Sequence, residues 1–330
     1  MKTAIVILNW NGRSLLEQFL PSVIAHSKEA DIYLADNAST DESIQYVKAT
    51  FPEIQIVKNE VNGGYAKGYN DALTKIDADL YCLLNSDVEV TKDWLVPVIE
   101  AFENFSDVAA IQPKILDYKK KTHFEYAGAG GGFIDGFGYP YCRGRIFDTL
   151  EEDHGQYNDT IPIFWASGAC LFVRKSVFEE VGKLDEDFFA HQEEIDLCWR
   201  ILNRGYKIIY VGASTVYHLG GATLTNMNPK KTFYNFRNSL YLTVKNVKGS
   251  RIWWIIFTRL ILDGIAGVKF LLEGKLSHTI AIIKAHFSFY RNLPKIVKKR
   301  KKHASQKKYY SVSFVVWQYY ILKRKLFNQL

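Results

Sequence analysis

Cysteine is scarce in this chain of 330 residues, and its four copies stand far apart. Cys82, Cys142, Cys170 and Cys198 include no close pair, so the sequence offers neither the ligand spacing of a zinc knuckle nor a dense disulfide framework. A reducing compartment suits such isolated thiols. The apolar run that precedes Asn9 spans only five residues, which is too short for the core of a secretory signal peptide. We therefore expect a cytoplasmic protein.

Long hydrophobic stretches without charge are also missing. The most apolar part, residues 251–272, contains Arg259, Asp263 and Lys269, and these charges argue against a simple membrane span. Two adjacent tryptophans stand near its start, and such side chains favour the headgroup level of a bilayer. We expect a helix that lies in the membrane interface and does not cross it.

Acidic residues are nearly absent from the last third of the chain. Residues 1–225 hold 20 Lys and Arg against 33 Asp and Glu, whereas residues 226–330 hold 22 against 2. Such a break indicates an α/β domain over 1–225 and a basic, amphipathic, mainly helical region over 226–330. The basic runs at 295–303 and 311–327 suit an anionic membrane surface. Alternatively, these helices pack on the first domain or on another subunit, and their lysines are simply solvated.

Short apolar runs alternate with amphipathic stretches in the first half, which is the pattern of βα units feeding a mostly parallel sheet. This pattern predicts an α/β, Rossmann-like fold with helices flanking the sheet. Residues 117–165 lose the periodicity and gather glycine, tyrosine and charge, so we expect an irregular insertion there. The predicted strands cover residues 4–8, 32–35, 54–57, 80–84, 169–173, 207–211 and 214–218.

The stretch QEEIDLCWR, residues 192–200, begins a predicted helix with three carboxylates in five positions. The apolar residues of this helix fall on one stripe. Glu193 and Glu194 therefore lie in the first turn, where the helix dipole favours negative charge. Asp196 and Arg200 have the spacing to pair on another face. The dipole explains part of this charge, and a chemical role for one carboxylate stays open.

Polar side chains directly follow several predicted strands. Asn9, Asp36, Asn85 and Asp87 stand where ligands bind in an open α/β sheet, beyond the carboxyl ends of the strands. A carboxylate there can accept hydrogen bonds from a nucleobase or ribose, and the turn around Ser86 can present Asp87 to a divalent cation. Each residue alone is as readily a loop or cap residue. Their recurrence at strand ends favours a nucleotide site.

Seven blocks of the sequence carry a family resemblance. They read IVILNWNG, LADNAST, NGGYAKGYN, LLNSDVEV, SGACLFVRKSVFEEVGKLDEDFF, EEIDLCWRILNRGY and VYHLGG. In this order, over about residues 3–245, they resemble the family 2 glycosyltransferases, especially the bacterial rhamnosyltransferase-like branch. The resemblance implies a GT-A fold, a nucleotide-diphosphosugar donor, a divalent cation (Mg²⁺ or Mn²⁺) and transfer with inversion at the anomeric carbon.

The resemblance also implies roles for single residues on the donor side. Asp36 matches the residue that contacts the nucleobase, and the turn around Asn9 lines the same pocket. Asp87 matches the metal-binding carboxylate, and His218 matches a further metal ligand. Asn85 departs from the family pattern because it replaces an Asp. The donor-binding set is Asn9, Asp36, Asn62, Gly63, Gly64, Lys67, Asn85 and Ser86.

Glu194 matches the catalytic base, which takes the proton of the attacking sugar hydroxyl. The family usually has Asp at this position, so the side chain of Glu194 is longer by one methylene, and Glu193 or Asp196 stays an alternative base. Trp165 is a possible acceptor-side residue because aromatic faces suit sugar rings, although a buried core tryptophan is as common. Glu193 is another possible acceptor-side residue. The insertion 117–165 is expected to form the acceptor side.

Three functions compete on these grounds. The leading hypothesis is a hexosyltransferase that adds a sugar to a glycan or lipid-linked acceptor in bacterial surface polysaccharide synthesis, bound peripherally to the inner face of the cytoplasmic membrane. The second is a GT-A-like carbohydrate-binding module without catalysis, because the base position is substituted. The third is a nucleic-acid-binding protein that uses the basic tail. Basic charge does not explain the acids at the strand ends, so we expect no nucleic-acid partner.

Overall fold

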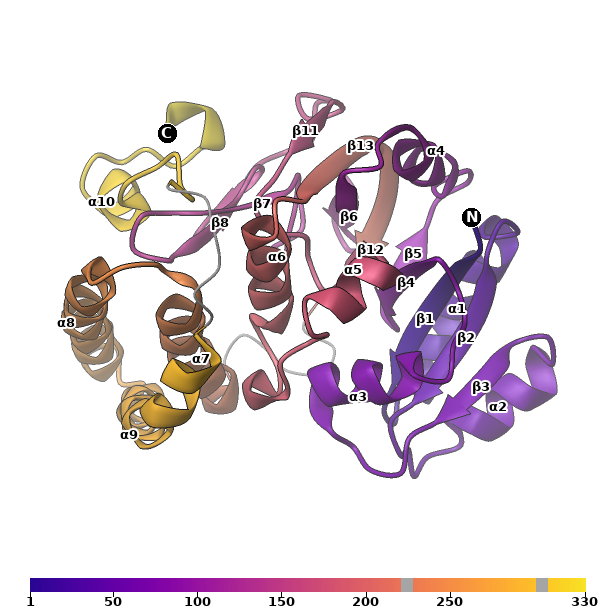
Figure 1. The fold of residues 1–330 in the computed structure, drawn as a ribbon, viewed down its shortest axis with the longest axis horizontal. Coiled ribbons are helices and arrows are strands. Elements are labelled where there is room, and N and C mark those ends of the chain that lie inside the picture. Colours follow the sequence, from indigo (N-terminus) through magenta and orange to yellow (C-terminus); the bar gives the residue numbers. More distant parts are fainter. Residues whose placement is uncertain (221–227, 301–307) are drawn as a thin grey trace.

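The computed structural model describes residues 1–220, 228–300 and 308–330. These residues form one large sheet with helices on both faces, a small second sheet and a group of C-terminal helices (Figure 1). The expected α/β fold with a helical C-terminal region is therefore confirmed. The expected boundary between residues 225 and 226, and residues 301–303 of the basic run, lie outside the described residues.

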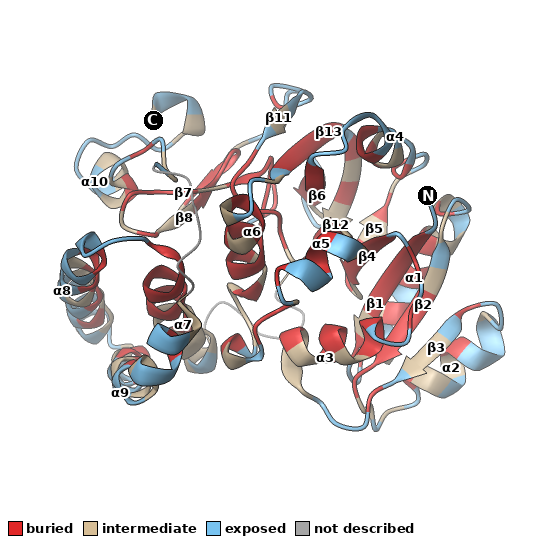
Figure 2. Cartoon of the chain, in the orientation of Figure 1, coloured by how far each residue is buried: buried red, intermediate tan, exposed pale blue. Residues whose placement is uncertain are grey.

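The first part of the chain consists of βα units. The strands are continuous apolar runs, and β1, β2 and β4 are almost fully buried because helices cover both faces of the sheet (Figure 2). The elements are β1 (Thr3–Asn9), α1 (Arg13–His26), β2 (Asp31–Asp36), α2 (Ser43–Thr50), β3 (Gln55–Lys58), α3 (Gly64–Leu73), β4 (Leu80–Asn85), β5 (Val88–Val90), α4 (Val96–Asn104) and β6 (Val108–Asp117).

The large sheet has the strand order β11-β13-β6-β12-β4-β1-β2-β3, and β5 also pairs with β13. Strand β1 pairs in parallel with β2 and β4, and β2 pairs in parallel with β3. Strand β12 lies between β4 and β6 and is antiparallel to both. The two strands predicted over 207–218 are one strand with a register shift between Val211 and Thr215. After residue 165 the chain continues with β12 (Cys170–Arg174), α5 (Lys175–Glu180), η1 (Glu186–Phe188), α6 (Glu193–Asn203) and β13 (Lys207–His218).

The segment 117–165 is not irregular throughout, so that expectation is wrong. Its strands are only two or three residues long, and for this reason they leave no readable alternation in the sequence. A residue near the end of the chain also holds this segment in place: the Val315 backbone N–H donates a hydrogen bond to Asp135 at 2.9 Å. The strands are β7 (Gly132–Ile134), β8 (Pro140–Cys142), β9 (Arg145–Ile146), β10 (Thr149–Leu150) and β11 (Thr160–Pro162); β7 to β10 form the small antiparallel sheet.

The C-terminal helices lie beside the sheet domain, with α7 between α6 and α8 (Figure 1). Two of the three charges that interrupt the apolar stretch 251–272 face inward, and Lys269 is exposed: Arg259 donates to the Phe137 carbonyl at 3.1 Å, and Asp263 lies 3.1 Å from His286 Nε2. Among the described residues, no helix combines the length and the hydropathy of a membrane span. The elements are α7 (Pro229–Asn246), α8 (Arg251–Leu272), α9 (Leu276–Lys299), α10 (Val315–Tyr320) and η2 (Phe327–Gln329).

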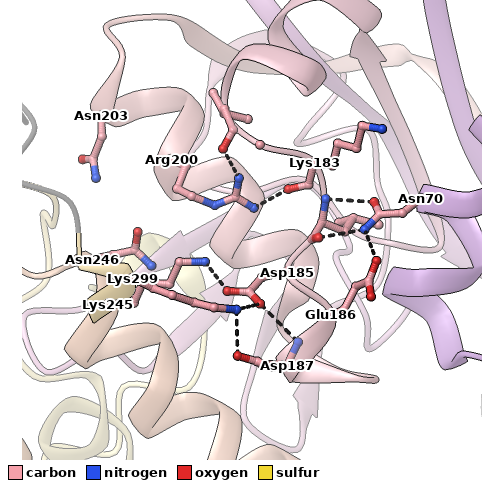
Figure 3. A pocket seen from close by; sticks show the side chains of 13 residues that line it. Asn70, Lys183, Asp185, Glu186, Asp187, Arg200, Asn203, Lys245, Asn246 and Lys299 are labelled. Atoms are coloured by element: carbon pink, nitrogen blue, oxygen red, sulfur yellow. Dashed lines mark hydrogen bonds and ion pairs between the residues drawn. The ribbon is translucent and has the colours of Figure 1, made fainter. Parts of the chain in front are cut away.

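A buried ion-pair network joins these helices to the sheet domain (Figure 3). Lys245 of α7 contacts Asp185 at 2.6 Å and Asp196 of α6 at 2.8 Å, and Lys299 of α9 contacts Asp185 at 2.6 Å and Asp187 at 2.7 Å. Burial alone would raise the pKa of Asp185, but the two lysines outweigh it and hold that pKa below the usual range. Part of the basic excess of the C-terminal region therefore neutralises acids of the first domain.

We expect Lys245→Met to lower the free energy of unfolding by about 3 kcal/mol, because it leaves two buried carboxylates with one fewer partner each. This loss of free energy is at the lower end of the range for breaking a buried ion pair, because Lys299 still contacts Asp185 and Arg200 still contacts Asp196. Chemical denaturation measures the change. Lys248→Met, at an exposed position three residues away, is the control and should change stability by less than about 0.5 kcal/mol. Equal effects of the two variants would contradict the role of the network.

Candidate active site

The site begins where β1, β2 and β4 end at the same edge of the sheet. The parallel register places Asn9 opposite Asp36 and Leu8 opposite Asn85, so three of the predicted strand-end residues meet. The Asn9 amide donates to Asp36 Oδ1 at 3.4 Å and to Ser43 Oγ at 3.0 Å. These contacts hold the side chains of Asn9 and Asp36 at the carboxyl ends of the strands.

A tight turn shapes this corner of the site. Asn9 is fully buried, and its Oδ1 has no hydrogen-bond partner within the described chain. A Cβ at Gly12 would lie 2.6 Å from that oxygen, so the close approach of the turn requires glycine there. A buried acceptor without a partner costs free energy unless a ligand or water satisfies it. The corner is therefore suited to a ligand that donates a hydrogen bond.

Asp87 and His218 face each other because β5 pairs antiparallel with the end of β13. His218 lies opposite Val88 in the register, and the Leu219 N–H donates to the Asp87 carbonyl at 3.0 Å. As a result Asp87 Oδ1 lies 3.2 Å from His218 Nε2. The Asn85 amide nitrogen is 3.4 Å from the same ring atom. Asn85 and His218 are 133 positions apart in the sequence, yet they form one cluster with Asp87.

Glu125 completes the cluster, and sequence reasoning missed it. Its Oε2 lies 3.4 Å from His218 Nδ1, so the imidazole stands between two carboxylates. Burial would lower the pKa of His218, but Glu125 and Asp87 outweigh burial and raise that pKa to about 10. Nothing in the aperiodic sequence around Glu125 marks it, since the residue reaches the site only through the fold of the insertion.

The donor set fits a divalent cation that completes its shell with substrate. Across the described residues, no group of three or more His, Cys, Asp or Glu side chains forms a ready metal site. Asp87 instead offers one carboxylate at the sheet edge, and His218 offers one imidazole once its proton is displaced by the cation. Mg²⁺ and Mn²⁺ are commonly held by few protein ligands, with phosphate oxygens and water filling the other positions. Asp87 and His218 are therefore the residues that would hold such an ion.

The glycine-rich loop contacts the segment that leads into α6. Gly64 has φ +76°, and a Cβ there would lie 2.6 Å from the Phe189 carbonyl oxygen, which accepts the Tyr65 N–H at 3.0 Å. Asn62 Oδ1 accepts the Gly64 N–H at 3.0 Å.

Lys67, expected on the donor side, pairs with Asp71 at 2.8 Å in this structure. A Cβ at Gly63 would strike the Lys67 side chain, and Ser86 Oγ lies 3.9 Å from the Cβ position of Gly12.

The two glutamates at the start of α6 differ in environment. The residue before them, Gln192, has a left-handed backbone with φ 72° and donates to the Asn235 carbonyl of α7 at 3.2 Å. Glu193 is buried, its Oε2 has no hydrogen-bond partner among the described residues, and burial together with the Glu194 charge raises its pKa well above the usual value. Burial raises the pKa of Glu194 to about 7.

Tyr65 and Asn85 meet at a short segment of the chain. The Tyr65 hydroxyl donates to the Gly168 carbonyl at 2.8 Å, and the Asn85 N–H donates to the Ala169 carbonyl at 3.0 Å. Burial raises the pKa of Tyr65, and Tyr69 together with the charges of Glu193 and Glu194 raises it further. Residues 168 and 169 thus connect α3, which carries Tyr65, to the strand-end residue Asn85.

Two further predicted residues lie in the interior. Trp165 is 4% exposed, its indole donates to the Phe133 carbonyl at 2.8 Å, and its ring lies against the Gly132 backbone, so the structure places it in the core. Asp196 is fully buried. Burial would raise its pKa, but Lys245 and Arg200 outweigh burial and lower it. Asp196 therefore holds α6 in place.

Comparison with known proteins identifies the family. The model of glycosyl transferase family 2 matches residues 4–182. This chain belongs to glycosyl transferase family 2. The N-acetylglucosaminyl-diphospho-decaprenol L-rhamnosyltransferase of Mycobacterium tuberculosis is 25% identical over 267 residues, which cover 76% of this chain and 85% of the relative. This family 2 glycosyltransferase is also 25% identical to Rhamnosyltransferase WbbL of Escherichia coli over 202 residues, 58% of this chain and 75% of the relative.

The fold of the glycosyltransferase recurs in solved structures. The mannosyltransferase PcManGT from Pyrobaculum calidifontis, solved in complex with GDP-Man and Mn²⁺, matches with a TM-score of 0.54 and 12% sequence identity. The match covers 91% of this chain and 84% of that one. At this identity the likeness concerns the fold alone.

We expect Gly64→Ala to be more destabilising than Gly274→Ala, although both glycines have a positive φ. Gly274 has no atom within 4 Å of its Cβ position, so its substitution costs only the left-handed backbone strain of about 1–2 kcal/mol. At Gly64 the new methyl also meets the Phe189 carbonyl, which must move. Denaturant unfolding of the two variants isolates this contact, and equal losses of stability would show that the Gly64–Phe189 approach is not tight in solution.

Proposed function

We propose that this enzyme moves a hexose from a nucleotide-diphosphosugar to a hydroxyl of a glycan or lipid-linked acceptor, with inversion at the anomeric carbon. The observation that carries the proposal is the Asp87–His218 pair at the sheet edge that also holds Asn9 and Asp36. A nucleotide-diphosphosugar needs a polar pocket for its nucleoside and a site for its diphosphate. The residues at the strand ends can form the nucleoside pocket and the diphosphate site side by side.

On the donor side, the nucleobase would hydrogen-bond to Asp36 and the corner formed by Asn9. Asn62, Gly63 and Gly64 of the glycine-rich loop would lie against the sugar nucleotide. Asp87 and His218 would hold Mg²⁺ or Mn²⁺ beside the diphosphate. Such a cation neutralises the negative charge that develops on the departing diphosphate. The GDP-Man and Mn²⁺ bound to the mannosyltransferase of the same fold support this assignment.

On the acceptor side, Glu194 would act as the general base. A base works best when its pKa lies near the working pH, and a pKa of about 7 meets that condition. Burial raises the pKa of Glu193 well above its usual value, and its Oε2, without a hydrogen-bond partner among the described residues, suits a hydrogen bond to the acceptor. Asp196 is engaged by Lys245 and Arg200, so it is a poor candidate for proton transfer. In this account the acceptor hydroxyl loses its proton to Glu194 as its oxygen bonds to the anomeric carbon and the nucleoside diphosphate leaves.

The acceptor would be lipid-linked, and the pathway would be synthesis of a bacterial surface polysaccharide. The relative from Mycobacterium tuberculosis carries a diphospho-decaprenol acceptor in its name and L-rhamnose as the transferred sugar. Rhamnose is therefore the first donor sugar to test. A lipid-linked acceptor also calls for an enzyme bound peripherally at the inner face of the cytoplasmic membrane, to which the basic C-terminal region is suited.

We expect the turnover rate of the wild-type enzyme to rise with pH through an apparent pKa near 7, because only the deprotonated carboxylate of Glu194 accepts a proton. Glu194→Gln should lower kcat by roughly 100- to 10,000-fold, the usual range for loss of a general base, and leave donor binding nearly unchanged. Nucleotide release from a panel of activated sugars measures the rate, and calorimetry with the nucleoside diphosphate measures binding.

Glu193→Gln is the matched control, since it makes the same chemical change one residue earlier in the helix. It should retain the pH profile with an altered KM for the acceptor. Full activity of Glu194→Gln together with an inactive Glu193→Gln would assign the base to Glu193. A pH-independent rate in the wild type would contradict a titrating base altogether.

A further inference from the structure

The outer side of α8 exposes a continuous apolar stripe. Six of its large apolar residues recur at intervals of three or four, and each is more than half exposed. The opposite side of the helix packs inward through Ile252, Ile255 and Ile256. Figure 2 shows α8 and α9 at the edge of the molecule with exposed residues along both helices. The stripe consists of Trp254, Phe257, Ile261, Ile265, Val268 and Leu272.

Helix α9 repeats this pattern beside α8. Its first five exposed apolar residues alternate between spacings of four and three and the sixth follows after seven, so they form one row, while Ala281, Ile282, Ala285 and Phe289 are buried on the other side. The two helices are joined by a short turn and pack on each other. Two exposed apolar rows of this length on neighbouring helices are unusual for a chain that stays alone in water. The row consists of Leu276, Ile280, Ile283, Phe287, Tyr290 and Val297.

A basic row runs directly alongside the apolar row of α9. Lys284, Arg291 and Lys298 each follow an apolar member of the row by one position, at intervals of seven residues, and all three are exposed. Acidic residues cannot balance them, because residues 226–330 contain only Asp263 and Glu273. Asp263 is buried against His286, and Glu273 is paired with Lys275. The surface therefore combines exposed apolar side chains with three basic side chains that form no ion pair with any of the described residues.

We propose that this outer α8–α9 face, defined by the two apolar rows and the basic row, docks on an anionic lipid bilayer. An apolar face flanked by Lys and Arg is the composition of helices that lie in the bilayer interface. Both helices would lie parallel to the membrane, with their apolar side chains reaching about 5–10 Å into it. The inference rests on the proposed function for its purpose, which is to hold the enzyme where a lipid-linked acceptor is found.

A second copy of the chain is the competing occupant, and charge argues against it. A symmetric contact through this face would place the two basic rows near each other, and neither copy offers an acidic row to pair with them. Anionic headgroups supply the missing negative charge. The adjacent Trp253 and Trp254, 50% and 64% exposed near the start of α8, are side chains that favour the headgroup level of a bilayer.

Vesicle flotation of the full chain tests the proposal. The wild-type protein should float with vesicles of phosphatidylcholine and phosphatidylglycerol at low salt and float poorly with phosphatidylcholine alone. Phe287→Glu, and separately the triple change Lys284→Glu, Arg291→Glu and Lys298→Glu, should each weaken binding roughly tenfold or more. Phe105→Glu is the matched control, because Phe105 is also an exposed phenylalanine, at 51% against 72% for Phe287, but lies on the sheet domain, and it should float like the wild type.

Three results would overturn the proposal. One is absence of flotation with either lipid mixture, and another is flotation that Phe287→Glu leaves unchanged. The third is a wild-type dimer that Phe287→Glu converts to a monomer in sedimentation equilibrium without any vesicle binding, which would assign the face to a second copy. Unfolding midpoints equal to that of the wild type confirm that the variants fold.

A transfer assay with a water-soluble acceptor separates this inference from the proposed function. Phe287→Glu should retain transfer to that acceptor while losing vesicle binding. If every acceptor fails but the wild-type protein still floats with anionic vesicles, the proposed function fails and the docking surface stands. If transfer succeeds but the wild-type protein does not float with anionic vesicles, the docking surface fails and the proposed function stands.

Discussion

The pairing of β5 with the end of β13 is the constraint on which the site depends. It sets His218 opposite Val88 and thereby brings the Asp87 carboxylate within 3.2 Å of the imidazole. Strand β13 also runs parallel to β6, and the chain that leaves β6 carries Glu125 to the other nitrogen of the same ring. One histidine is thus fixed by two strands and one loop. A shift of register by one residue would turn its side chain to the opposite face of the sheet.

The charge asymmetry of the sequence has two uses in the folded protein. Lysines of α7 and α9 enter the sheet domain, where Lys245 and Lys299 neutralise buried acids beside α6. This network anchors the helix whose first turn carries Glu193 and Glu194, so the C-terminal region takes part in building the site. Lys284, Arg291 and Lys298 of α9 are exposed and form no ion pair with any of the described residues. The inward lysines stabilise the fold, and the outward ones suit an external anionic surface.

Much of the fold follows from local sequence, because buried parallel strands are continuous apolar runs that end at polar residues. The meeting of Asn9, Asp36 and Asn85 could be predicted from this rule alone, since parallel strand ends share one edge. The Asp196–Arg200 pair could also be predicted, because its spacing is local. Bringing His218 to Asp87 needed the family resemblance, since the pairing of β5 with β13 joins segments that lie far apart in the sequence.

Other features could not be predicted, each for a physical reason. Glu125 lies among strands too short to leave a periodicity, and Lys245 reaches Asp196 across 49 residues of sequence. The central claim is that Asp87 and His218 hold a divalent cation for the donor diphosphate. Calorimetric titration of the wild type and of Asp87→Asn with a nucleoside diphosphate, with and without Mn²⁺, tests it most directly. The account predicts tight binding only for the wild type with Mn²⁺; equal binding without the metal, or in the variant, would contradict it.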